Sequence, residues 1–177
     1  TLLKMIAGIE SPRSGKIFLD ENDITPLPVR KRKLGIVFQS YALFPHMTVI
    51  ENVAYPLKVR KISVEKRRTM AKAALERVGL DELGQRYPKT LSGGQQQRVA
   101  VARAVVAKPK LILADEPTGN LDNETTELVM NLFHHHNEQG TTLLIATHDH
   151  TIYRDVDHRL LELRGGQMHQ LRDGVVQ

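Results

Sequence analysis

Two apolar segments of the chain end in side chains that can bind cations and move protons. Residues 111–114 (LILA) run into Asp115 and Glu116, and residues 143–147 (LLIAT) run into His148 and Asp149. Short, continuous apolar runs of this kind are typical of buried strands in a parallel sheet. Ligands of such sheets bind at the carboxyl ends of the strands. The pattern therefore predicts a nucleotide site at the rim of a parallel sheet.

The adjacent carboxylates and the imidazole suit different parts of one hydrolytic reaction. One carboxylate is suited to hold Mg²⁺, usually through water, and the next can polarise an attacking water molecule. An imidazole after the neighbouring strand can donate a hydrogen bond to developing charge and orient that water. An Asp-Glu pair after a strand is common in loops, so the pair by itself indicates this chemistry only moderately.

The segment Ser92-Gly93-Gly94-Gln95 has the composition of an anion-binding helix start. Ser92 and Gln95 form a capping-box pattern, in which the hydroxyl accepts from the third amide and Gln95 reaches back. The two glycines remove side chains where a backbone must approach a ligand. The exposed amides and positive end of the helix dipole suit a phosphate. The alternative is an ordinary capped helix with flexible glycines.

The remaining elements alternate as a layered α/β domain requires. From residue 45 to residue 90 strand signals are weak and helical signals prevail, which predicts a helical block inserted into the sheet domain. Within it, Ser63 caps a helix that reaches Val78, with Met70, Ala71, Ala74, Leu75 and Val78 on one face and Gly79 at the end. The other predicted elements are a helix over 2–8, a turn over 11–15, strands over 16–20, 34–38 and 159–163, and a turn at Gly165-Gly166.

The order of these motifs resembles the ATP-binding cassette (ABC) ATPases. The resemblance rests on residues 91–95 (LSGGQ) with 96–104 (QQRVAVARA), on 115–118 (DEPT) and on 119–122 (GNLD). It implies an α/β fold, a P-loop NTPase (RecA-like) parallel-sheet core with an inserted α-helical subdomain. The expected organisation is a single domain over 1–177, with 1–39 and 96–177 as the core and 40–95 as the helical subdomain.

The resemblance also implies a role for each matching position. Asp115 matches the metal-side carboxylate of the Walker B motif, Glu116 the general base, and His148 the switch histidine that contacts the γ-phosphate. Gln39 matches the Q-loop glutamine, which can reach the metal and its water. The expected site residues are Glu116, His148 and Gln39 for catalysis, Thr1, Ser92, Gly93, Gly94, Gln95 and Asp122 for ATP, and Asp115 and Gln39 for Mg²⁺.

The sequence contains no G-x-x-x-x-G-K-[ST] phosphate loop, which an NTPase of this kind needs. Residues 1–8 resemble the helix that follows that loop in the family, and Thr1 resembles the loop's last threonine. We therefore expect the chain to be truncated at its N-terminus, with the preceding strands and the Walker A loop missing, and to bind ATP poorly as given. The alternative is a degenerate cassette with a structural role.

The resemblance implies two protein partners. A second cassette is expected to pair head-to-tail, so that each signature segment closes on ATP held by the other chain. A transmembrane permease subunit is expected to contact residues 40–53, which resemble the docking segment of importer cassettes. Tyr41, Leu43, Phe44 and Met47 would form that apolar patch, unless they fill the core of the helical block. Residues 119–122 instead resemble lipoprotein-releasing, macrolide-exporting and cell-division cassettes, and we give this signal more weight.

Composition limits the remaining classes. The 177 residues include no cysteine, which excludes disulfides and cysteine-based metal or nucleophile chemistry and fits a reducing cytoplasm. No apolar run approaches the roughly 20 residues of a membrane span, so we expect a peripheral protein on the cytoplasmic face of the membrane. The net charge of +5 suits nucleic acid, anionic lipid or a solvated surface. The few aromatic residues and the lack of a heptad coiled-coil pattern argue against a DNA-associated cassette. Residues 134–136 are three consecutive histidines, and we expect them to be surface or partner-facing residues.

Overall fold

A computed structural model describes residues 2–153 and 158–172 of the chain. These residues form two compact units, Thr1–Ala146 and Thr147–Gln177. The division into a core of 1–39 and 96–177 with a helical subdomain of 40–95 is a different partition, and it stays a prediction. The two units are described in turn.

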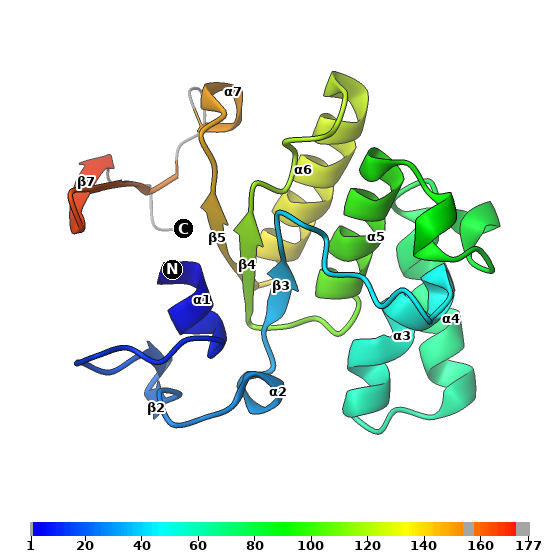
Figure 1. Ribbon diagram of the computed structural model, residues 1–177, viewed down its shortest axis with the longest axis horizontal. Helices are drawn as coiled ribbons and strands as arrows, with labels where there is room; N and C mark the ends of the chain where they lie inside the picture. Colours follow the sequence, from blue (N-terminus) through cyan, green and yellow to red (C-terminus); the bar gives the residue numbers. More distant parts are fainter. Residues whose placement is uncertain (1, 154–157, 173–177) are drawn as a thin grey trace. The chain divides into compact units, whose positions relative to one another are not determined.

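The centre of the first unit is a parallel sheet of three strands (Figure 1). Its order is β3 (Gly35–Val37), β4 (Leu111–Asp115) and β5 (Thr142–Ala146), with Val37 opposite Ala114 and Asp115 opposite Ala146. Strand β4 is central, and its residues 111–114 are all buried, as a continuous apolar run predicts for a parallel strand. All three strands end at the same edge of the sheet, so the segments after β3 and β4 meet there.

The first segment of the chain forms a small layer beside this sheet. It contains α1 (Leu2–Ala7), the hairpin of β1 (Phe18–Leu19) and β2 (Asn22–Asp23), and α2 (Val29–Arg32). The predicted strand over 16–20 is shorter than expected, because Asp20 takes a left-handed conformation (φ 52°) and turns the chain into β2. Gly8 ends α1 with φ 82°, as predicted.

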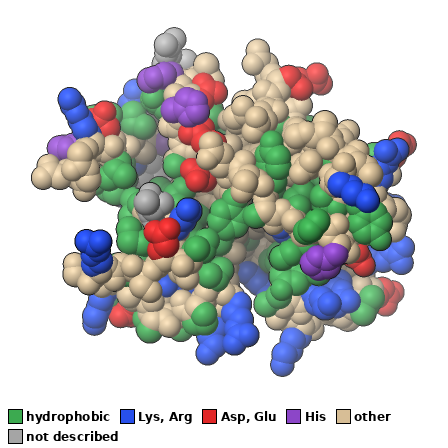
Figure 2. All heavy atoms as spheres, viewed as in Figure 1, with side chains coloured by type: hydrophobic (Ala, Val, Ile, Leu, Met, Phe, Trp, Pro, Cys, Tyr) green, Lys and Arg blue, Asp and Glu red, His purple; other side chains and the backbone are tan. Residues whose placement is uncertain are grey.

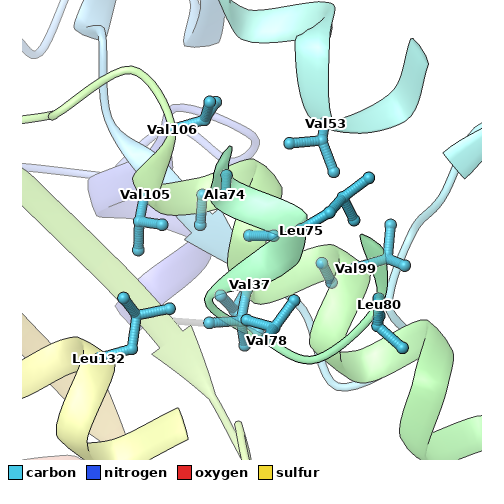
Figure 3. Packing of buried hydrophobic residues seen from close by; sticks show 14 of the residues in the cluster. Val37, Val53, Ala74, Leu75, Val78, Leu80, Val99, Val105, Val106 and Leu132 are labelled. Carbon is cyan, nitrogen blue, oxygen red and sulfur yellow. The ribbon is translucent and has the colours of Figure 1, made fainter. Parts of the chain in front are cut away.

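The helical block is present where the sequence predicts it. It consists of α3 (Val49–Val59), α4 (Val64–Glu76) and the short 3₁₀ turns η1 (Asp81–Leu83) and η2 (Pro88–Thr90), and it leads into α5 (Gly93–Val105). Ser63 caps α4, and the predicted apolar face of this helix is buried at Ala71, Ala74 and Leu75. Figure 3 shows this face packed with Val53 and Val99 of the neighbouring helices. Burial of this shared core holds α5 against the block.

Helix α6 (Asn123–Glu138) corrects one prediction about the histidines. His136 is only 3% exposed, whereas all three residues of 134–136 were expected at the surface. The reason is helical periodicity: His136 shares a face with Val129, Leu132 and Phe133, which are all buried. Burial lowers the pKa of the His136 imidazole, and the positive charges of Arg77 and Lys108 lower it further.

The second unit contains α7 (His150–Tyr153) and an antiparallel hairpin of β6 (Leu160–Arg164) and β7 (Gln167–Arg172). The hairpin turns at Gly165 and Gly166, both with positive φ, as the sequence predicts.

Among the helices that the structure describes, none combines the length and the apolar character that crossing a membrane requires. On the face shown in Figure 2, Lys and Arg side chains lie among Asp and Glu side chains, which is the distribution expected of a solvated surface.

Candidate functional site

The turn after β4 has an unusual backbone at its second carboxylate. Asp115 is the last residue of the strand, and Glu116 follows with φ 49°, in the left-handed region that a side chain normally disfavours. Its amide donates to the carbonyl of Ala146 at the end of β5 over 2.9 Å. A left-handed non-glycine residue costs on the order of 1–3 kcal/mol, and such strain is concentrated at functional sites. The turn therefore fixes the direction in which Glu116 leaves the sheet.

A side chain from α5 supports the same turn. Gln97 is completely buried, and its Nε2 donates to the carbonyl of Pro117 over 2.6 Å and to the carbonyl of Glu116 over 3.3 Å. Together with the Ala146 contact, this places a hydrogen bond on each side of the Glu116 Cα. The carboxylate position is thus determined jointly by β5 and by α5.

The first turn of α5 is built as the sequence predicts. Ser92 Oγ accepts from the amide of Gln95 over 3.3 Å, and Gln95 Oε1 accepts from the amide of Ser92 over 3.0 Å, which completes the capping box. Ser92 and Gly93 are exposed, and no acidic residue occupies this turn. The exposed amides and the positive helix end form a surface that suits a phosphate.

Both glycines of this turn lie against neighbouring loops. A Cβ on Gly93 would come within 3.1 Å of Tyr41 Oη, and a Cβ on Gly94 would come within 3.4 Å of the Asn120 carbonyl oxygen. The distance at Gly93 is tight, so the Tyr41 hydroxyl would have to shift slightly, whereas the distance at Gly94 corresponds to an ordinary van der Waals contact. Both distances show that the start of α5 contacts the segment after β3 on one side and the 116–122 segment on the other.

The segment after β3 is held by a buried arginine. Tyr41 and Ala42 have φ of 61° and 47°, and their carbonyls accept from the guanidinium of Arg103 over 2.8 Å and 2.7 Å. Arg103 is 8% exposed, and desolvation lowers its pKa to about 10, so it remains charged at neutral pH. Its guanidinium also lies over the Phe44 ring, 5.7 Å from the centroid. Gln39 is exposed and lies two residues before the segment that Arg103 holds.

Asp115 ends β4 and Gln39 follows the neighbouring strand β3, so both lie at the same edge of the sheet, since Val37 pairs with Ala114. Asp115 is half-buried and Gln39 is exposed, and both offer oxygen donors. A hard cation such as Mg²⁺ takes one or two protein oxygens and retains several waters, which fits this donor set. Within the described ranges, no three His, Asp or Glu side chains gather closely enough to form a protein-only metal site.

The other predicted ligands are placed as follows. Asp122 caps α6: its Oδ1 accepts from the Thr125 amide over 2.8 Å, and the Thr125 amide and hydroxyl lower the pKa of the Asp122 carboxyl. His148 belongs to the second unit, where it precedes α7. Thr1 lies outside the described residues. The first unit thus contains Gln39, Ser92–Gln95, Asp115, Glu116 and Asp122, and their roles in binding and catalysis stay predictions.

Sequence reasoning did not identify Gln97 and Arg103. Both are polar residues on the buried face of α5, which is otherwise apolar at Ala100, Val101 and Ala104. A polar residue within an apolar helical stripe was the available signal, because a buried polar group requires partners. Those partners lie about 20 and 60 residues away along the chain, so the sequence pattern could not name them.

Comparisons with known proteins agree with this geometry. The family model described as ABC transporter matches residues 1–119. The cell division ATP-binding protein FtsE of Escherichia coli K12 is 45% identical over 174 residues, which cover 96% of this chain and 78% of FtsE. The spermidine/putrescine import ATP-binding protein PotA of Chromobacterium violaceum is 45% identical over 172 residues, 97% of this chain but 48% of PotA.

A solved structure matches the fold over nearly the whole chain. It is the dimeric post-hydrolysis state of the ATP-binding cassette MJ0796 bound to ADP and Pi, with a TM-score of 0.86 and 36% identity. The match covers 97% of this chain and 79% of the MJ0796 chain. The chain belongs to the ABC transporter family, and it is an ATP-binding and ATP-hydrolysing cassette.

Proposed function

We propose that the protein works as a head-to-tail pair of cassettes that binds ATP with Mg²⁺ and drives a membrane-embedded permease. The observation that carries the proposal is the first turn of α5. Among the described helices of at least eight residues, α3, α4 and α6 carry Glu51, Glu65 and Glu124 in their first turns, whereas α5 carries no acidic residue. The positive dipole end of α5 is therefore left for an anionic ligand.

The pairing of two chains follows from how this turn is presented. Ser92 and Gly93 are exposed, while the opposite face of α5 is buried in its own chain. An exposed anion-binding turn can close on a phosphate held by another molecule. The solved relative MJ0796 is a dimer, which supports this arrangement. In such a pair, each ATP lies between one chain's Glu116 edge and the other chain's Ser92 turn.

Within each site the residues would divide the work as the sequence predicts. Glu116 accepts the proton of the attacking water, and Asp115 with Gln39 holds Mg²⁺, whose charge neutralises the phosphates when it is bound. The Ser92 hydroxyl and the Gly93 and Gly94 amides donate to the γ-phosphate of the partner's ATP. His148 donates to the charge that develops on it. Asp122 caps α6, and it places the 119–122 segment beside the start of α5.

The permease would bind beside α3. Tyr41 and Leu43 pack partly against the hydrophobic core, as the alternative prediction for them had it. Phe44 and Met47 are half-buried and are not part of that packing, whereas Val49 and Val53 are fully buried. The segment therefore retains apolar surface for a partner. Arg103 connects this surface to α5, so movement of α5 on ATP binding would reach it. We expect a peripheral location on the cytoplasmic face, imposed by the permease.

The transported cargo is a property of the permease, and the relatives differ in role. FtsE is named for cell division and PotA for spermidine and putrescine import, at equal identity to this chain. Residues 119–122 (GNLD) favour the cell-division or exporter type. Copurification of the protein with the permeases of its cell, followed by identification of the bound subunit, separates these roles.

The experiment that tests the catalytic proposal is Glu116→Gln in the protein expressed from its complete gene. We expect turnover to fall by at least roughly 100-fold, because the general base is lost, while ATP binding is retained. Glu127→Gln, an exposed carboxylate on α6, is the matched control and should keep wild-type turnover. Near-normal turnover of Glu116→Gln would overturn the assignment of the base.

A further inference from the structure

We propose that Gln97 is a positioning residue for hydrolysis: its side-chain amide holds the Glu116 turn in register with α5. The inference rests on the proposed role of Glu116 as general base. Gln97 contacts neither ATP nor water in this account, and it acts through the backbone of the turn. Gln97 lies on the helix whose first turn is proposed to bind the partner's ATP, and it contacts the turn that carries Glu116. We therefore also infer that Gln97 couples the two ATP sites of a dimer.

The hydrogen bonds fix which end of the Gln97 amide faces the turn. Two carbonyl oxygens, of Glu116 and Pro117, approach the same side-chain atom at 3.3 Å and 2.6 Å. Two acceptors require the NH₂ group, because an oxygen in that place would be repelled by both. The remaining Oε1 is buried and has no partner among the described residues. An unpaired buried oxygen is unfavourable, and the two hydrogen bonds that the NH₂ group donates to the turn offset this cost.

The turn needs this support because its backbone is strained. Glu116 has φ 49°, and its amide is already committed to the Ala146 carbonyl. The Gln97 contact constrains the carbonyl on the other side of the same residue. Without it, the Glu116 carbonyl keeps only the longer hydrogen bond from the Gly119 amide, at 3.4 Å, and the Glu116 backbone is held less firmly in its left-handed conformation. The Glu116 Cβ, and with it the carboxylate, would then point in a different direction relative to the attacking water.

The same contact connects the helix that is proposed to bind the partner's ATP with the proposed base, Glu116, of its own chain. Gln97 lies two residues after Gln95 on one continuous helix, whose first turn is proposed to bind the partner's ATP. Helix α5 moves as a rigid element, so a shift of its first turn carries Gln97 with it. Phosphate binding at one site is thereby transmitted to the base of the other site, which belongs to the same chain as Gln97.

The primary test is Gln97→Met, which keeps the length of the side chain and removes the NH₂ group. In the protein expressed from its complete gene, we expect kcat to fall roughly 10- to 100-fold, with KM for ATP within about twofold of wild type. The matched control is Thr141→Val. Thr141 is also buried, and its hydroxyl donates to the Pro109 carbonyl over 3.0 Å just before β5, at the opposite edge of the sheet. The control loses a comparable bond and should keep kcat.

A second variant provides a readout that a purely structural role would not change. In Gln97→Glu, the introduced carboxylate faces two carbonyl oxygens, and protonation restores one donor. We therefore expect kcat of this variant, relative to wild type, to rise as the pH is lowered from 8 to 6. Amide hydrogen exchange of Gln97→Met provides a measurement independent of activity: the Glu116 and Gly119 amides should exchange faster than in wild type.

The outcomes separate this inference from the catalytic proposal. If Glu116→Gln is inactive while Gln97→Met keeps wild-type kcat and exchange rates, the role of Gln97 is overturned. A pH-independent ratio of Gln97→Glu to wild-type kcat would also contradict it. If Glu116→Gln keeps normal turnover, the proposed base is wrong, whatever the Gln97 variants do. Equal losses of kcat in Thr141→Val and Gln97→Met would reduce the effect to general destabilisation and refute the positioning role.

Discussion

Helices α5 and α6 begin in the same way and differ in charge. In each, a side-chain oxygen of the capping residue accepts from the amide three residues on: Ser92 from Gln95 over 3.3 Å, and Asp122 from Thr125 over 2.8 Å. The α5 cap is a neutral hydroxyl followed by two glycines. The α6 cap is a carboxylate, and Glu124 adds a second negative charge.

The difference shows which helix end is prepared for a ligand. In α6 the positive dipole end is compensated within the chain, and the hydrogen bonds from Thr125 lower the pKa of Asp122 and favour its charged form. In α5 that compensation is missing, so a phosphate can provide it. Both ends flank the same 116–122 segment, since Gly94 lies against Asn120. One helix start is therefore compensated within the chain, and the other is the one that we propose binds ATP.

The largest expected effect comes from giving α5 the charge of α6. Ser92→Asp should keep the helix, because Asp caps as well as Ser. It should lower turnover by at least roughly 100-fold, because a carboxylate repels the γ-phosphate. ATP hydrolysis and a thermal melt of the same preparation measure both quantities. If Ser92→Asp keeps both the wild-type turnover and the wild-type melting temperature, the missing negative charge at the start of α5 has no role in ATP hydrolysis.

The reverse change on α6 tests stability. Asp122→Ala removes the cap and should lower the free energy of unfolding by about 1 kcal/mol. Urea unfolding followed by circular dichroism measures it. The isosteric Asp122→Asn, which retains a capping oxygen, is the control and should lose much less. Equal losses in the two variants would mean that the cap bond contributes little to α6.

A smaller, pH-dependent effect is expected at the other end of α6. The folded-state pKa of His136 lies below its ordinary value of 6.5, so the unfolded chain binds the proton first as the pH falls. Stability from this residue is therefore present at neutral pH and is lost as the pH drops below about 6.5. Unfolding of wild type and His136→Leu between pH 7.5 and 5 measures the difference, with exposed His135→Leu as control. An identical pH slope in wild type and His136→Leu would contradict the assignment.

The smallest effect belongs to Glu124→Gln. Removing one exposed charge near the start of α6 should cost about 0.3 kcal/mol at low salt, and less at high salt, because the interaction with the helix dipole is screened. Urea unfolding at two salt concentrations measures this. A loss that is the same at both would exclude the dipole as its cause.

Local patterns predicted much of the fold. The caps at Ser63 and Ser92, the ends at Gly8 and Gly79 and the buried strand 111–115 each depend on residues close in sequence, and all are present. The strand predicted over 16–20 is present as β1, but its hairpin partner β2 was missed because it has only two residues.

The support of the candidate site could not be predicted in the same way. Tyr41, Ala42 and Glu116 have positive φ without being Gly or Asn, so no turn signal marks them. Their conformations are held by Arg103 and Gln97, which lie far away in sequence. Tertiary hydrogen bonds therefore decide the site geometry, while the sequence identifies the residues that would do the chemistry.

The most direct test of the account mixes two inactive variants, Ser92→Asp and Glu116→Gln, expressed from the complete gene. If each ATP lies between one chain's Glu116 and the partner's Ser92, a mixed dimer contains one intact site. Equal mixing should then restore up to about one quarter of wild-type turnover, because half of the dimers are mixed and each has one of two sites intact. Coupling of the two sites through α5 would lower this value without abolishing the recovery. No recovery, in a mixture shown to exchange subunits, would contradict the shared site.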